Sequence, residues 1–138
     1  MNVTLPPDYK PCMDEEFMNP EMVEYFRQKL IAWRTELVQE SNSTLLQLQE
    51  GGIVEADVAD RASIETERSL ELRTRDRARK LINKIDGGLE RIEGGTYGFC
   101  GETDEPISLS RLEARPIATL SIEAQERHER MERTHRDD

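Results

Sequence analysis

The sequence predicts a mainly α-helical protein, in which a long antiparallel coiled-coil hairpin is followed by a small globular module and a C-terminal helix. Apolar residues recur at alternating gaps of three and four residues in two separate stretches. This spacing places them on one face of each helix, where the two helices can pack together. Gly51-Gly52 lies between the stretches, and a short turn between two long helices favours an antiparallel pair.

The first helix is expected to begin at Asn19-Pro20-Glu21, because Asn is a favoured N-cap, Pro fits the first helical position and an acid suits the first turn. Its apolar stripe consists of Val23, Phe26, Leu30, Trp33 and Leu37, continued by Leu45 and Leu48. The spacing therefore predicts one helix that ends near the paired glycines.

The second helix is expected to follow a cap at Asp57 or Asp60 and contains no proline as far as Ile92. Its apolar stripe consists of Ala78, Leu81, Ile85, Leu89 and Ile92, with Leu70 and Leu72 nearer its start. The pair Gly87-Gly88 lies inside this helix and is expected to kink or fray it, since each glycine costs about 1 kcal/mol against alanine.

Four regions are expected along the chain. Residues 1–18 contain three prolines and no periodicity, which indicates an extended N-terminal arm. Residues 19–93 form the hairpin, with its tip near residues 51–62. Residues 94–120 mix Gly, Pro and polar residues and predict a compact irregular module, and residues 121–138 predict a charged C-terminal helix.

Composition limits the classes of function. The 138 residues carry a formal net charge of -10, which argues against a protein that coats nucleic acid, because neutralising phosphate needs a basic surface. There is no apolar run long enough to span a membrane and no signal-peptide pattern at the N-terminus. The two cysteines are too few for a secreted disulfide scaffold. We therefore expect a cytoplasmic protein.

The second helix is divided by charge. Its first part is rich in acids: Glu55, Asp57, Asp60, Glu65, Glu67 and Glu71. Its second part is rich in bases: Arg73, Arg75, Arg77, Arg79, Lys80 and Lys84, against Asp76 alone. This layout is common on solvated coiled-coil faces with i,i+4 ion pairs. It also suits a rod that carries carboxylates into a basic or metal-containing channel.

Three segments resemble the DksA/TraR family of bacterial transcription factors. They are DVADRAS at residues 57–63, SLELRTRDRARKLINKI at 69–85 and YGFCGETDEPISLSRLEARPIATLSIEA at 97–124. The resemblance covers residues 19–130 and implies a protein that binds RNA polymerase and inserts its coiled-coil tip into the secondary channel. It further implies that open complexes at ribosomal RNA promoters become less stable, with ppGpp strengthening the effect in the stringent response.

The resemblance also implies roles for individual residues. Asp57, Asp60 and Ala62 match the tip residues of the family that act on the polymerase, and we expect Asp60 to have the largest effect. An N-cap role for Asp57 is the structural alternative. Arg77 matches a shaft residue that contacts the polymerase, and a surface ion pair is its alternative.

A ppGpp site shared with the polymerase rim helices is implied at Leu81, Lys84 and Arg115. A lysine position of this site holds Gln125, which offers no cation to a phosphate. The structural alternative for Arg115 is that it fixes the turn before Pro116. Because the implied site is shared with the polymerase, ppGpp is expected as an effector at that interface and not as a resident cofactor.

The module is expected to be a degenerate zinc-finger-like fold without zinc. The family carries four cysteines here, whereas this chain has Cys100, Thr103, Ser121 and Ala124 at those positions. One thiolate, two hydroxyls and a methyl do not complete a four-thiolate site. We expect a small apolar core to replace the metal: Tyr97, Phe99, Ile107, Leu109, Leu112, Ile117, Leu120 and Ile122.

Other classes of function are less well supported. The sequence has no Gly-rich phosphate loop and no Ser–His–acid arrangement, so we expect no enzyme. A Gre-type transcript-cleavage factor or another secondary-channel factor is the main alternative, because it also carries an acidic tip. A coiled-coil adaptor is a further alternative, but a hairpin satisfies its own seam, so we expect a monomer without sequence-specific DNA binding.

Overall fold

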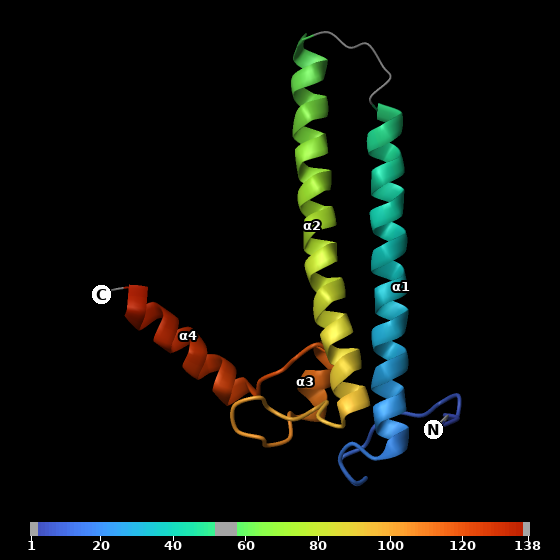
Figure 1. Cartoon of the computed structure of the whole chain (residues 1–138), viewed down its shortest axis with the longest axis vertical. Coiled ribbons are helices and arrows are strands. Elements are labelled where there is room, and N and C mark those ends of the chain that lie inside the picture. Colours follow the sequence, from blue (N-terminus) through green and yellow to red (C-terminus); the bar gives the residue numbers. More distant parts are fainter. Residues whose placement is uncertain (1–2, 52–57, 137–138) are drawn as a thin grey trace. The chain divides into compact units, whose positions relative to one another are not determined.

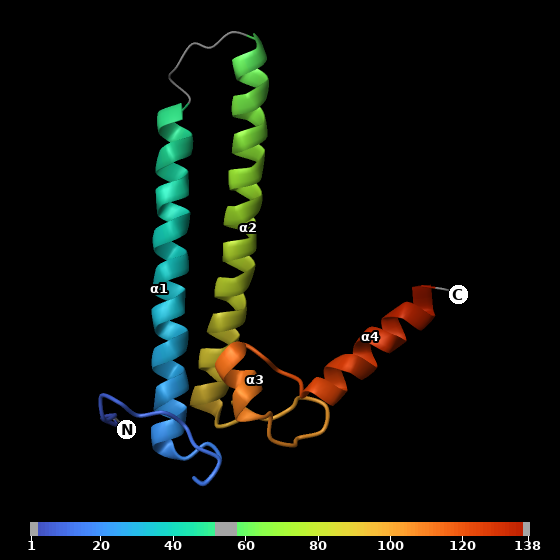
Figure 2. The same ribbon diagram turned by 180° about the vertical axis from the view of Figure 1, so that it is seen from behind.

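The computed structural model describes residues 3–51 and 58–136 and contains four helices in this part of the chain. They are α1 (Pro20–Gly51), α2 (Val58–Gly94), α3 (Leu109–Ala114) and α4 (Ile122–Arg136). In both Figure 1 and Figure 2, α1 and α2 lie side by side and run in opposite directions. The mainly helical fold expected from the sequence is confirmed.

The chain divides into two compact units. The terminal unit comprises Met1–Leu30 and Asp86–Asp138, and the shaft unit comprises Ile31–Ile85. Helices α1 and α2 each contribute one part to each unit. The division into the four regions expected from the sequence stays a prediction.

In the terminal unit, α1 begins as the sequence predicts. The Asn19 side-chain oxygen accepts a hydrogen bond from the Met22 backbone N–H at 2.9 Å, which confirms the N-cap. Met22, Phe26 and Leu30 follow at gaps of four and are fully buried. They form the α1 side of a core to which the module contributes Tyr97, Cys100, Ile107, Leu112, Ile117 and Ala118, and α4 contributes Ala124.

The apolar core expected for the module is confirmed in part. Tyr97, Ile107, Leu112 and Ile117 are buried, and Leu109 and Leu120 are half-buried. Phe99 and Ile122 are 36% and 47% exposed, so their assignment to the core was wrong. Phe99 instead packs edge to face on Phe17, with 5.4 Å between the ring centroids, and Ile122 is the first residue of α4.

Helix α2 passes through Gly87-Gly88 without a break, and the expected fraying is not observed. Gly88 is buried, and a Cβ built on it would lie 3.3 Å from Leu30 Cδ1. The missing side chain therefore lets α1 and α2 approach closely in the terminal unit. This packing offsets the low helix propensity of glycine.

In the shaft unit, buried and half-buried residues recur along the inward face of α2 at gaps of four and three. These positions are Ile64, Arg68, Glu71, Arg75, Ala78, Ile82 and Ile85, and Leu81 is half-buried beside them. Leu70 and Leu72 are 55% and 49% exposed, so their place in the apolar stripe was wrong. The heptad register that buries Ala78 and Ile85 turns both leucines outward, because helical residues share a face only at gaps of three or four.

Candidate functional site

The tip residues are placed only in part. Asp57 lies outside the described residues. Asp60 belongs to the first turn of α2, which begins at Val58. Ala62 follows on the same helix and is exposed. The expected roles of all three residues stay predictions, as does the N-cap alternative for Asp57.

Three shaft residues follow one another on the surface of α2. Arg77 and Lys84 are exposed, and Leu81 between them is half-buried. Their gaps of four and three place them along one side of the helix. Arg77 makes no ion pair with a residue in the described ranges, so the surface ion pair considered for it is not observed there.

The RLEARP segment forms α3 and the turn that follows it. The Ser108 hydroxyl caps α3 by accepting a hydrogen bond from the Arg111 backbone N–H at 3.3 Å. Arg115 ends the helix and donates its backbone N–H to the Arg111 carbonyl at 2.7 Å, while its side chain is exposed. The Arg111 guanidinium donates to the Leu120 carbonyl at 2.9 Å and so fixes the next loop. Arg111 is thus structural, and Arg115 presents a cation to solvent.

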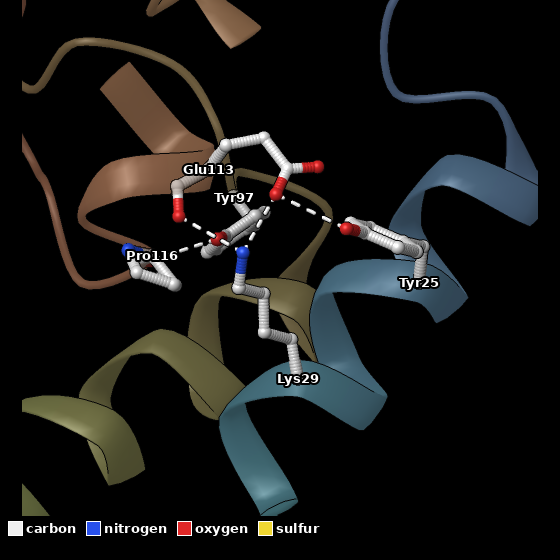
Figure 3. Close-up of polar contacts among 5 residues, drawn as sticks. All are labelled: Tyr25, Lys29, Tyr97, Glu113 and Pro116. Atoms are coloured by element: carbon white, nitrogen blue, oxygen red, sulfur yellow. Dashed lines mark hydrogen bonds and ion pairs between the residues drawn. The ribbon is translucent and has the colours of Figure 1, made fainter. Parts of the chain in front are cut away.

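A polar cluster joins this segment to α1, as Figure 3 shows. Glu113 Oε2 accepts hydrogen bonds from Lys29 Nζ at 2.6 Å and from the Tyr25 hydroxyl at 3.0 Å. Lys29 Nζ also donates to the Glu113 carbonyl at 2.9 Å. Tyr97 donates its hydroxyl to the Pro116 carbonyl at 2.7 Å. These bonds hold both ends of the Glu113–Pro116 turn that carries Arg115.

The electrostatics of this cluster follow from its contacts. Partial burial raises the pKa of Glu113, but the hydrogen bonds from Lys29 and Tyr25 outweigh it and leave that pKa below its ordinary value. Burial and the Glu113 carboxylate raise the pKa of Tyr25 to about 12. Sequence reasoning missed Lys29 and Tyr25, because they are about 85 residues from Glu113 and no motif connects them.

The four positions at which the family carries cysteines have separate structural roles in this chain. Ser121 caps α4 by accepting a hydrogen bond from the Ala124 backbone N–H at 3.2 Å, and Ala124 is buried. The Thr103 hydroxyl accepts from the Glu105 backbone N–H at 3.3 Å. Cys100 is buried at 1% exposure.

The Cys100 thiol has an unusual acidity. Burial raises its pKa, but hydrogen bonds from the Thr103 side chain and from neighbouring backbone groups outweigh this effect and lower the pKa to about 6. Near it, His128 of α4 contacts the carboxylate of Glu102. This pair links α4 to the loop that follows Cys100.

The chain matches two family descriptions. Residues 22–92 match the N-terminal domain of the DnaK suppressor protein DksA, and residues 95–130 match the prokaryotic dksA/traR C4-type zinc finger. A Caulobacter vibrioides protein named RNA polymerase-binding transcription factor DksA is 63% identical over 95% of this chain and 92% of its own length. The protein of the same name from Escherichia coli K12 is 43% identical over 83% of this chain and 76% of its own length.

A solved structure supports the same relationship. Transcription factor DksA2 from Pseudomonas aeruginosa is 42% identical, with a TM-score of 0.79 over 85% of this chain and 90% of that chain.

Among the described residues, no helix is long and apolar enough to cross a membrane.

The expectation of a module without zinc requires correction. The match of residues 95–130 to a C4-type zinc finger contradicts it, because the whole segment follows the pattern of a zinc-binding class. The expectation weighed only the four ligand positions and not the segment around them. Within residues 3–51 and 58–136, no three His, Cys, Asp or Glu side chains are grouped to hold a metal. No zinc-dependent step is assigned to any residue of the chain.

The family matches cover both the long helices and the module, and the two relatives cover 95% and 83% of the chain. This chain belongs to the DksA family.

Proposed function

We propose that this chain regulates transcription by binding RNA polymerase. The observation that carries the proposal is the 63% identity over 95% of the chain to a relative named RNA polymerase-binding transcription factor DksA. The long helices α1 and α2 support it, because a slender helix pair can enter a channel that a globular domain cannot. No catalytic role is proposed for any residue.

The tip is the part that acts on the polymerase in this proposal. The hairpin enters the secondary channel, and Asp57, Asp60 and Ala62 approach the catalytic region. Asp60 makes polar contacts with mobile polymerase elements, and open complexes at ribosomal RNA-type promoters become less stable. Arg77 contacts the polymerase along the shaft, which agrees with its exposed side chain.

The effector ppGpp binds between the chain and the polymerase rim helices. Leu81 and Lys84 of the shaft unit and Arg115 of the terminal unit supply the contacts. The exposure of Lys84 and Arg115 supports this role, because both cations can reach a phosphate. The cluster of Tyr25, Lys29 and Glu113 keeps the turn before Pro116 in place, so Arg115 is presented from a rigid support.

Multiple-round transcription from a ribosomal RNA promoter tests the proposal, with and without ppGpp. The wild type should inhibit, and Asp60→Asn should bind polymerase equally well yet inhibit much less. Asp76→Asn is the matched control, because it removes an exposed carboxylate from the same helix away from the tip. Lys84→Gln and Arg115→Gln should each reduce the response to ppGpp while leaving inhibition without ppGpp nearly unchanged.

Two results would count against the proposal. Tight polymerase binding without inhibition would leave a secondary-channel factor of another kind, and a cleavage assay on stalled complexes would then identify a Gre-type activity. Equal inhibition by the wild type and Asp60→Asn would remove the tip mechanism. The expected monomer and cytoplasmic location stay predictions, and sedimentation at several concentrations tests the first.

A further inference from the structure

A small cleft lies between α1 and α2 in the shaft unit. Its volume is about 160 Å³, and its lining residues are Val38, Ser41, Asn42, Arg75, Arg79 and Ile82. Arg75 and Arg79 come from successive turns of α2, and both line the same cleft. Two apolar side chains and two short polar ones complete its lining.

The lining of the cleft contains two cationic side chains and no acidic one. Neither Arg75 nor Arg79 makes an ion pair with a residue in the described ranges 3–51 and 58–136. Arg75 is half-buried, which limits its contact with water. Like charges at i,i+4 destabilise a helix, and an oxyanion between them removes the repulsion. Guanidinium groups bind carboxylate or phosphate oxygens through paired, charge-assisted hydrogen bonds.

The size of the cleft favours a single anionic group. Pockets for small molecules usually have volumes of about 300–1,000 Å³, so a cleft of about 160 Å³ does not enclose a nucleotide. One carboxylate side chain fits it, with its oxygens on the guanidinium groups and its methylenes against Val38 and Ile82. Ser41 and Asn42 can donate further hydrogen bonds at the rim.

The surrounding charge favours a protein partner. Residues 73–84 contain six basic residues and one acid in a chain whose net charge is -10. This local basic stretch attracts an acidic surface and orients it towards the cleft. We propose that Arg75 and Arg79 bind one Asp or Glu side chain on the surface of RNA polymerase, an inference that rests on the proposed function.

Matched double variants test this inference. Arg75→Gln with Arg79→Gln removes both charges from the cleft, and Arg73→Gln with Lys80→Gln removes two exposed charges from the same stretch without changing the cleft lining. Glutamine keeps a high helix propensity, and circular dichroism checks that helicity is unchanged. Affinity for polymerase is measured by fluorescence anisotropy at several salt concentrations.

The cleft variant should bind polymerase at least about tenfold more weakly, and the control less than about threefold, because only the cleft pair makes bidentate bonds. An equal loss in both variants would overturn the inference and leave a general effect of charge. Failure of the wild type to bind polymerase would instead overturn the proposed function itself, and this inference with it.

The source of the oxyanion is tested separately. Arg79→Lys places an amine at the cleft, and a carbodiimide should join it to a polymerase carboxylate that mass spectrometry then identifies. The absence of any crosslink at position 79, while other lysines react, would overturn the inference. Inorganic phosphate at constant ionic strength should weaken polymerase binding by the wild type no more than it weakens binding by the Arg75→Gln with Arg79→Gln variant. Selective competition with the wild type would assign the cleft to phosphate and overturn the carboxylate.

Discussion

Replacing Glu113 by glutamine should destabilise the protein at neutral pH and have little effect in acid. The carboxylate accepts hydrogen bonds from Lys29 and Tyr25 at 2.6 and 3.0 Å. A hydrogen bond to a charged group contributes about 1.5–3 kcal/mol when water is excluded. The Lys29 and Glu113 side chains are 35% and 37% exposed, so solvent screening lowers the expected loss to about 1 kcal/mol.

The pH dependence of this loss has a definite sign. Burial raises the pKa of Glu113, but the bonds from Lys29 and Tyr25 outweigh it, so the folded-state pKa is depressed. Its stabilising contribution is therefore fully present above the unfolded-state pKa of about 4.3. The contribution is lost as the pH falls through the lower folded-state pKa. The difference between the wild type and Glu113→Gln should thus disappear in acid.

Urea unfolding at neutral and acidic pH measures this difference, followed by the near-ultraviolet circular dichroism of the tyrosines. Glu105→Gln is the matched control, because Glu105 is an exposed carboxylate in the same unit. The reasoning would be refuted by equal losses in Glu113→Gln and Glu105→Gln at neutral pH. It would also be refuted by a loss that stays constant into acid.

Two further predictions concern the terminal unit. Gly87→Ala should raise the free energy of unfolding by up to about 1 kcal/mol, because it gains helix propensity and its Cβ would meet only a flexible side chain at 3.5 Å. Gly88→Ala should gain less or lose stability, because its Cβ would lie 3.3 Å from Leu30. Thermal unfolding compares the two variants, and an equal gain in both would contradict the close approach of the helices. In a Cys12→Ser background, the thiolate absorbance of Cys100 should titrate with a midpoint of about 6, and a midpoint near 8.5, the ordinary value for cysteine, would contradict the hydrogen bonding described.

The features that could be predicted from the sequence depend on local patterns. The N-cap at Asn19 follows from residue type, and the structure has it. The predicted stripe of α1 is confirmed in part: Phe26, Leu30 and Leu37 are buried, but Val23 and Trp33 are half-buried and Met22 is buried in addition. The side chains of Leu45 and Leu48 lie outside the described residues. The module core at Tyr97, Ile107 and Leu112 was also predictable, because large apolar residues in a short polar segment have few other places to go.

The features that could not be predicted depend on tertiary contacts. Leu70 and Leu72 were assigned to the stripe because they are apolar, but the register of α2 is set by Ala78 and Ile85. Gly88 resembles a helix breaker until its distance to α1 is known. The candidate site was only partly predictable. Arg115 could be named from its motif, but the hydrogen bond from Lys29 to the Glu113 carbonyl, which holds the turn that carries Arg115, required the structure.

The charged residues on the inward face of α2 have a consequence for how the shaft unit opens. Arg68, Glu71 and Arg75 occupy positions where a coiled coil usually buries aliphatic side chains. Hydrating these three side chains exposes little apolar surface of α2, so the turns from Ile64 to Arg75 are expected to open at a lower free energy than the turns around Ala78 and Ile85. The turns of α2 from Ile64 to Arg75 can thus move while the turns around Ala78 and Ile85 stay packed.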